Sequence, residues 1–443
     1  MSTIDHQVSA DYRSGRRKAY RRLVPLMMAV YFMAFIDRSN LGMAKNSLEA
    51  DIGIGAAAYG LGAGIFFLSY ALLEVPSNLV LHRVGARWWI ARIAVTWGAI
   101  SSAMMFVTNE WSFYLLRFLL GAAEAGLYTG LLFLVTIWLD QKDRPKVIGY
   151  LLVASSMAVV LGSPLGGTLM LMEGIGGLYG WQWMFLVEGI PSIALGVVIW
   201  FLLPNRPAEA VWLSEREARA MTEAAADVGG EEHISGGLSA GFRNPLIICI
   251  ALIYFLNQIA TYGAIYFSPS VVESLGVTGS FRIGVVAGLI GIGAALGALL
   301  VPRMLRREEG EIPVITFCII GASLGGVAFL ALDEPLLKLL SLAAALFFIT
   351  GVLPMFWSVA MGRISGRMAA GVLAFVNTIG LCGGFVGPYL FGLVEDWTGS
   401  AEGGFYVLLV ALLVSLLLVP LASAARRRAP RTTAVEEMHA TST

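Results

Sequence analysis

Long apolar stretches, separated by short polar segments, recur along the whole chain and set its organisation. Most are about 17–25 residues long, enough for a helix to cross a hydrocarbon layer of about 30 Å. They show no strict alternation of polar and apolar residues, so they predict helices and not the strands of a membrane barrel. The twelve predicted spans are 23–43, 58–81, 88–107, 112–138, 147–172, 184–203, 246–271, 283–305, 312–331, 335–360, 368–394 and 404–425.

Composition supports a polytopic membrane protein. Hydrophobic residues make up 57% of the 443 residues and charged residues only 14%, and the mean hydropathy is +0.76. A soluble protein of this length needs a far more polar surface. All three cysteines, Cys249, Cys318 and Cys382, lie inside predicted spans without paired spacing, which favours neither a disulfide framework nor a metal site.

The basic residues gather on one side of the predicted membrane layer. Twelve spans place 24 of the 30 lysines and arginines on the side that holds both termini, which we call the basic side. The opposite side receives only Lys45, Arg282 and Lys338, together with acids such as Glu273 and Asp396. The positive-inside rule then predicts that both termini are cytoplasmic, which requires an even number of spans.

The only long polar segment between spans divides the chain into two sets of six. Its first part predicts a surface helix, and its second part, GGEEHISGGLSAG, predicts a flexible linker. Weakly similar motifs recur in the two sets about 220 residues apart, as expected of a transporter built from related halves. The predicted parts are a cytoplasmic tail (1–22), an N-terminal six-helix bundle (23–204), a cytoplasmic linker (205–242), a C-terminal bundle (243–426) and a cytoplasmic tail (427–443).

Two acids and two arginines lie inside predicted spans. Asp37 and Arg38 are adjacent in the first span, whereas Arg117 and Glu124 are seven residues apart in the fourth, on nearly one helix face. A charge in hydrocarbon costs about 2.5 kcal/mol or more, so such residues usually face a bundle interior or a water-filled cavity. We expect Arg38 and Arg117 to bind an anion, and Asp37 and Glu124 to carry a coupled proton. The alternative is that static ion pairs join the first and fourth spans.

Two further acids suggest gating or structural roles. Glu74 precedes a Pro-Ser kink in the second span, and Glu188 precedes Gly-Ile-Pro in the sixth. Each could pair in one conformation with a basic residue of a turn, such as Arg83 or Arg87 in the turn after the second span.

The second set of spans carries no charge at its span centres and offers amides and aromatic rings instead. Gln258 and Tyr262 are four residues apart and share one face of the seventh span. A charged first half and a neutral, aromatic second half suit a ligand with a carboxylate at one end and hydroxyls or a ring at the other. For the aromatic residues the alternative is packing or an interfacial belt.

Several stretches resemble the anion:cation symporter branch of the major facilitator superfamily, which includes tartrate, phthalate, hydroxyphenylacetate and sugar-acid permeases. They are IDRSNLGMA (36–44), YGLGAGIFFLSYALLEVPSNLVLHRVGAR (59–87), WGAIS (97–101), RFLLGAAEAG (117–126), GLYGWQWMFLVEGIP (177–191), NRPAEAVWLSERE (205–217) and NTIGLCGGFVGPYLFG (377–392). The resemblance implies twelve transmembrane helices in two pseudo-symmetric six-helix bundles. It also implies that Tyr70, Trp357 and Asn377 line the substrate cavity. Ser155 stands where some sugar-acid permeases carry a glutamine, so the substrate stays open among tartrate, a sugar acid and an aromatic carboxylate.

The predicted function is therefore proton-coupled uptake of an organic anion by alternating access between the two bundles. No catalytic constellation, nucleotide-binding sequence or metal-ligand cluster is present in the sequence, so we expect neither an enzyme nor a cofactor. The expected partners are a small organic anion, protons and the lipid bilayer of the inner (plasma) membrane. We expect a monomer that binds no nucleic acid. Two alternatives are a major facilitator antiporter that exports small molecules, and a transporter-like sensor that moves nothing.

Overall fold

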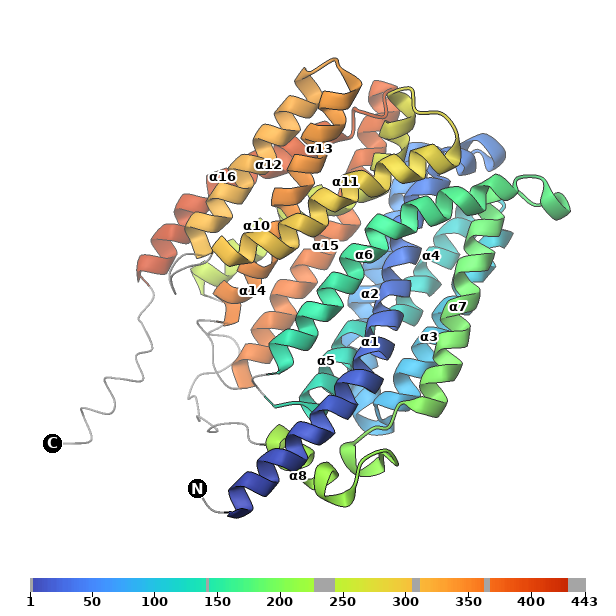
Figure 1. The fold of residues 1–443 in the computed structure, drawn as a ribbon. Coiled ribbons are helices and arrows are strands. Elements are labelled where there is room, and N and C mark those ends of the chain that lie inside the picture. Colours follow the sequence, from blue (N-terminus) through green and yellow to red (C-terminus); the bar gives the residue numbers. More distant parts are fainter. Residues whose placement is uncertain (1–2, 141–142, 227–243, 305–310, 362–366, 429–443) are drawn as a thin grey trace.

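The computed structural model describes residues 3–140, 143–226, 244–304, 311–361 and 367–428 (Figure 1). Within these residues all regular elements are helical, and twelve helical segments are long and apolar enough to cross a membrane. The predicted helical class and the number of spans are thus confirmed. The predicted flexible linker up to residue 242 and the C-terminal tail from residue 429 lie outside the described residues.

Each half of the chain contributes six spans, which we give here with their bounds. The first six are α1 (Thr3–Ile52), α2 (Ala56–Val84), α3 (Ala86–Ala103), α4 (Glu110–Glu124) with α5 (Leu127–Trp138), α6 (Arg144–Leu169) and α7 (Gly180–Leu202). The second six are α10 (Pro245–Ser274), α11 (Ser280–Leu300), α12 (Glu311–Ala331), α13 (Pro335–Gly351) with α14 (Leu353–Met361), α15 (Arg367–Thr398) and α16 (Phe405–Arg428). Short 3-10 helices are η1 (Met104–Phe106), η2 (Met170–Met172), η3 (Ile175–Gly177), η4 (Pro207–Glu209) and η5 (Val301–Met304).

The two halves pack against each other through equivalent helices. The second span of the first half, α2, packs against the fifth span of the second half, α15. In the same way α6, the fifth span, packs against α11, the eighth. This exchange of equivalent helices is what a pseudo-twofold relation between the halves requires. The first and seventh spans, α1 and α10, also touch, so polar residues of α1 lie between the halves.

Two spans that the sequence predicted as single helices are broken in the structure. The predicted helix 112–138 ends at Glu124 and begins again at Leu127, because Gly126 adopts a left-handed backbone with φ of 89°. The break frees backbone carbonyls, and Ser77 of α2 donates its hydroxyl to one of them, Ala125 O, at 2.6 Å. The predicted helix 335–360 is likewise divided into α13 and α14 at Val352. The first break directly follows Glu124, a residue of the candidate site.

The polar segment between the halves begins with a helix, α8 (Glu215–Ala226), that packs on the basic-side end of α1 (Figure 1). Residues 3–22, predicted as a tail, are part of α1 and provide this contact. Glu217 accepts hydrogen bonds from Ser14 Oγ at 2.6 Å and from Lys18 Nζ at 2.7 Å. Burial opposes the charged form, but these hydrogen bonds outweigh it and lower the pKa of Glu217 to about 2.

Candidate functional site

Arg38 and Glu124 form an ion pair between α1 and the end of α4. A terminal guanidinium nitrogen of Arg38 donates to Glu124 Oε1, and the Glu124 side chain is 1% exposed. The Arg38 guanidinium also lies 5.0 Å from the ring centre of Phe66 and 5.5 Å from that of Tyr70. Neither Arg38 Nε nor Glu124 Oε2 has a hydrogen-bond partner among the described residues. The pair therefore keeps a free donor and a free acceptor at a buried position.

Asp37 lies beside this pair but binds a different helix. Its Oδ1 accepts a hydrogen bond from Ser101 of α3, and its Oδ2 has no partner among the described residues. One turn further along α1, Asn40 donates to Glu188 Oε1 of α7, and Glu188 Oε2 is likewise without a described partner. Three buried carboxyl groups thus each keep one oxygen that can accept a hydrogen bond or a proton.

Arg117 is enclosed between α4 and α2. Its guanidinium donates to two backbone carbonyls of α2, Gly62 O at 3.3 Å and Ala63 O at 3.4 Å, and the residue is 1% exposed. It lies 4.8 Å from the ring centre of Phe66, so Phe66 contacts the guanidinium groups of both Arg38 and Arg117. The shared helix face predicted for Arg117 and Glu124 is buried as expected. The described contacts of Arg117 hold α2 and α4 together.

Polar and aromatic contacts join this cluster to the second half. Asn377 of α15 donates to Glu74 Oε2 of α2 at 3.0 Å, so two predicted site residues bind each other across the halves. The ring centres of Phe67 in α2 and Tyr262 in α10 are 4.2 Å apart. The structure therefore pairs Glu74 with an amide, whereas the sequence suggested a basic turn residue.

The remaining predicted residues of the second half are Gln258, Tyr262 and Trp357. Gln258 is 5% exposed, and its Oε1 has no partner among the described residues. Trp357, on α14, packs edge-on against Tyr254 with ring centres 5.6 Å apart. Tyr262 is linked to the charged cluster by a side-chain interaction with Arg38 and through Phe67, whereas Trp357 contacts Tyr254 of the second half.

Arg83 and Arg87, predicted as gating or structural residues, lie apart from the charged cluster. Arg83 is exposed, and Arg87 donates its backbone N–H to Asn205 Oδ1 at 2.9 Å and its side chain to Trp200 O. Arg87 therefore fixes the beginning of α3 to the end of α7. Neither arginine pairs with Glu74 or Glu188 among the described residues.

The sequence interpretation missed Arg92, Asn40 and Ser101. Arg92 lies in α3, its guanidinium is 3.9 Å from the ring centre of Trp89, and it approaches Ala123 O, beside the α4 break, at 3.5 Å. An arginine in an apolar run was a signal that the same reasoning could have used. Asn40 and Ser101 gave no such signal, because neutral polar residues are common in membrane helices.

Comparison with known proteins identifies the family. Residues 27–388 match the profile of the Major Facilitator Superfamily. A protein of Agrobacterium vitis provisionally named a tartrate transporter is 40% identical over 405 residues, covering 91% of this chain and 90% of its own. The quinolone resistance transporter of Acinetobacter baumannii is 35% identical, covering 90% of this chain and 92% of its own.

Among solved structures, a bacterial homologue of the human lysosomal transporter Spinster has a similar fold. Its inward-facing, occupied form superposes with a TM-score of 0.74 at 16% identity, covering 94% of this chain and 97% of that one. These relatives are membrane transporters and not enzymes, and the family expected from the sequence is confirmed. The chain is a multi-pass membrane protein that belongs to the major facilitator superfamily of transporters.

Proposed function

We propose that this transporter is a symporter that takes up an organic anion together with protons by alternating access. The observation that carries the proposal is the ion pair of Arg38 with the buried Glu124, beside the buried Asp37. A guanidinium stays charged even when partly desolvated, and it binds carboxylates with high geometric specificity. Arg38 is therefore suited to receive the carboxylate of a substrate.

Coupling to protons follows from competition for Arg38. While the site is empty, Arg38 compensates the charge of Glu124, which is fully enclosed. When a substrate carboxylate binds Arg38, Glu124 loses part of that compensation, and a buried unpaired carboxylate is costly. Glu124 then takes up a proton. Asp37, which has a hydroxyl donor but no cation within ion-pair distance among the described residues, is the second proposed proton carrier.

The second half completes the proposed substrate site with neutral groups. Gln258 offers a carbonyl oxygen that has no partner among the described residues, and Tyr262, Trp357 and Tyr70 offer aromatic faces. Asn377 reaches the site by exchanging its hydrogen bond to Glu74 for one to the substrate. The name of the Agrobacterium vitis relative supports tartrate as the first substrate to test. We place the protein in the inner membrane with cytoplasmic termini, on the charge distribution of its loops.

The proposal is tested with purified protein in liposomes that carry an imposed pH gradient, using labelled tartrate. The wild type should concentrate tartrate in the compartment that the gradient makes alkaline. Asp37→Asn and Glu124→Gln should each reduce this accumulation at least tenfold, whereas exchange of tartrate between equal pools should continue, because exchange needs no net proton movement. Glu110→Gln is the matched control, since Glu110 lies at the exposed first turn of the same helix as Glu124.

The same experiment separates the alternatives. Tartrate binding without any flux would favour a sensor. Movement of the anion against the proton flow would favour an exporting antiporter. Glu124→Gln protein that still concentrates tartrate would remove Glu124 from the coupling mechanism.

A further inference from the structure

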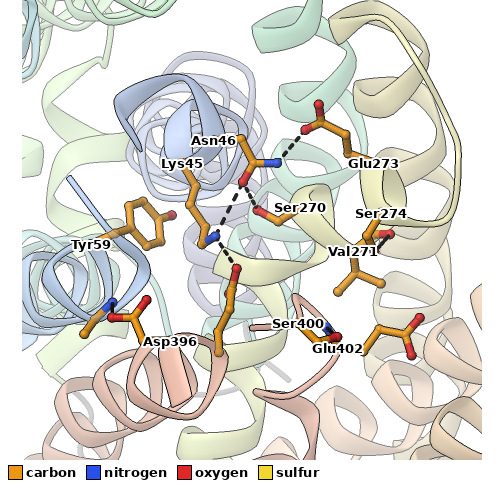
Figure 2. A network of polar contacts seen from close by, with 12 residues as sticks. Lys45, Asn46, Tyr59, Ser270, Val271, Glu273, Ser274, Asp396, Ser400 and Glu402 are labelled. Carbon is orange, nitrogen blue, oxygen red and sulfur yellow. Dashed lines mark hydrogen bonds and ion pairs between the residues drawn. The ribbon is translucent and has the colours of Figure 1, made fainter. Parts of the chain in front are cut away.

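A second polar network joins the halves at some distance from the charged cluster, nearer the end of α1 on the opposite side. Lys45 Nζ of α1 donates to Glu395 Oε1 of α15 at 2.7 Å. The neighbouring Asn46 donates to Glu273 Oε2 of α10 at 2.5 Å and accepts from Ser270 Oγ at 2.9 Å. We call these five residues the Lys45 network; Figure 2 shows Asn46 pointing toward the α10 residues Ser270 and Glu273, with Lys45 beside it.

The Lys45–Glu395 ion pair of this network connects the two halves of the protein. Among the ion pairs between described residues, Lys45–Glu395 alone connects a helix of the first half with a helix of the second. Lys45 is 1% exposed, and its ammonium also lies 5.4 Å from the ring centre of Phe267 in α10. Removing one member of such a pair leaves the other charge buried without compensation.

On the same side of the molecule, the backbones of α2 and α15 are in close contact. The backbone N–H of Ala57, in the first turn of α2, donates to Asp396 Oδ2 of α15 at 3.0 Å. One turn further along, α2 and α15 approach so closely that a side chain at Gly60 would place its Cβ 2.2 Å from Pro388 O. The halves are therefore in direct contact here, and a substrate has no passage between α2 and α15 at this level.

The network also has a rigid connection to the charged cluster. Lys45 follows Arg38 by seven residues on the same uninterrupted helix, which corresponds to two turns or about 10 Å. Between them, Tyr59 of α2 donates its hydroxyl to Tyr266 O of α10 at 3.3 Å. A movement of α1 that changes the position of Arg38 must therefore act on Lys45.

We propose that the Lys45 network closes the transporter on the side opposite the basic side, and that Lys45 is the positioning residue that links this closure to the central site. Opening toward that side requires Lys45 to leave Glu395 and Asn46 to leave Glu273. The charges of Lys45 and Glu395 then become hydrated. Their pairing therefore stabilises the closed state and not the open one. The inference needs only the transporter fold and is independent of the proposed substrate and of proton coupling.

The test measures the separation of the halves directly, without substrate or gradient. Spin labels are attached at residues 50 and 397, which are exposed and lie at the ends of α1 and α15 on this side. The distance distribution is recorded by pulsed electron resonance on the purified protein in lipid nanodiscs. Lys45→Ala and Glu395→Ala should each raise the ratio of long to short distances at least about fivefold. The exchange of both charges, Lys45→Glu with Glu395→Lys, should restore the short distance.

A matched control and a milder variant complete the design. Lys338 and Glu402 form an ion pair on the same side but within the second half, so Lys338→Ala and Glu402→Ala should leave the distances unchanged. If the Lys45 and Glu395 variants do not fold, Asn46→Ala, which removes contacts to Ser270 and Glu273 without removing a charge, should still lengthen the distances. Distances that stay short in every folded variant of the network would overturn the proposal.

Discussion

At the residue scale, the buried charges were the part of the site that the sequence could predict. A charged side chain within an apolar helix must find a partner or water, so Asp37, Arg38, Arg117 and Glu124 had to lie inside the bundle. The choice of partners could not be predicted, because it depends on how neighbouring helices are rotated. Arg117 binds two carbonyls of α2 and not an acid, and Asp37 binds Ser101.

Glu217 provides a residue-scale prediction about pH. Its pKa is lowered to about 2, so its contribution to the attachment of α8 is complete above the ordinary carboxyl pKa of about 4.3 and is lost as the pH falls toward 2. A nitroxide at residue 219, exposed on α8, should therefore stay immobile from pH 7 through pH 4 and become mobile only as the pH approaches 2. Its spectrum in nanodiscs gives this mobility directly.

Two variants distinguish the effect of Glu217 from that of another glutamate on the same helix. Glu217→Gln should make the label mobile already at pH 7, because the amide cannot form charge-assisted hydrogen bonds with both Lys18 and Ser14. Glu223→Gln, an exposed position of the same helix, should have no effect. A label that becomes mobile near pH 4 in the wild type would show that Glu217 has an ordinary pKa.

At the element scale, the spans were predictable but their breaks were not. Length and hydropathy located all twelve spans, and the first span in fact extends in both directions as α1. The sequence RFLLGAAEAG contains glycines at 121 and 126, and hydropathy does not distinguish them. Only the structure shows that Gly121 is helical, whereas Gly126 has a positive φ and divides the span. The break matters because it ends α4 at Glu124.

The break yields a prediction about stability. Gly126→Ala forces a Cβ into the left-handed region and to 2.2 Å from Ser77 Oγ, so it should lower the free energy of unfolding by about 1–2 kcal/mol or more. Thermal unfolding in detergent measures the loss. The control is Gly149→Ala in α6, where the added Cβ meets open space and alanine is the better helix former, so stability should be unchanged or slightly raised. Equal unfolding temperatures for Gly126→Ala and the wild type would contradict the assigned role of Gly126.

At the scale of the whole molecule, the duplicated halves were predicted from the linker and from weakly repeated motifs, and the fold agrees. The contacts between the halves were not predictable, because they involve residues more than about 100 positions apart. Lys45 was predicted as a residue of the opposite side, but nothing in the sequence selects Glu395 among the acids available there. The same holds for Glu74 and Asn377, which bind each other at 3.0 Å across the interface.

Some polar contacts of the molecule lie within the first half, and others cross between the halves. The central pair of Arg38 and Glu124 belongs to the first half, and in the proposed mechanism a substrate carboxylate displaces Glu124 from Arg38 so that Glu124 takes up a proton. The Glu74–Asn377 hydrogen bond and the Lys45 network do cross between the halves, so they must rearrange in alternating access. Arg38 of the central pair and Lys45 of the crossing network lie on the same helix, α1.

The central claim is that the substrate carboxylate and Glu124 compete for Arg38, and proton counting during binding tests it most directly. Tartrate is titrated into the purified transporter in two buffers of different ionisation enthalpy, and the difference in heat gives the protons exchanged per tartrate bound. The wild type should take up protons on binding, and Glu124→Gln should bind tartrate with that uptake reduced or absent. Binding to the wild type without proton uptake, or equal uptake by Glu124→Gln, would contradict the mechanism.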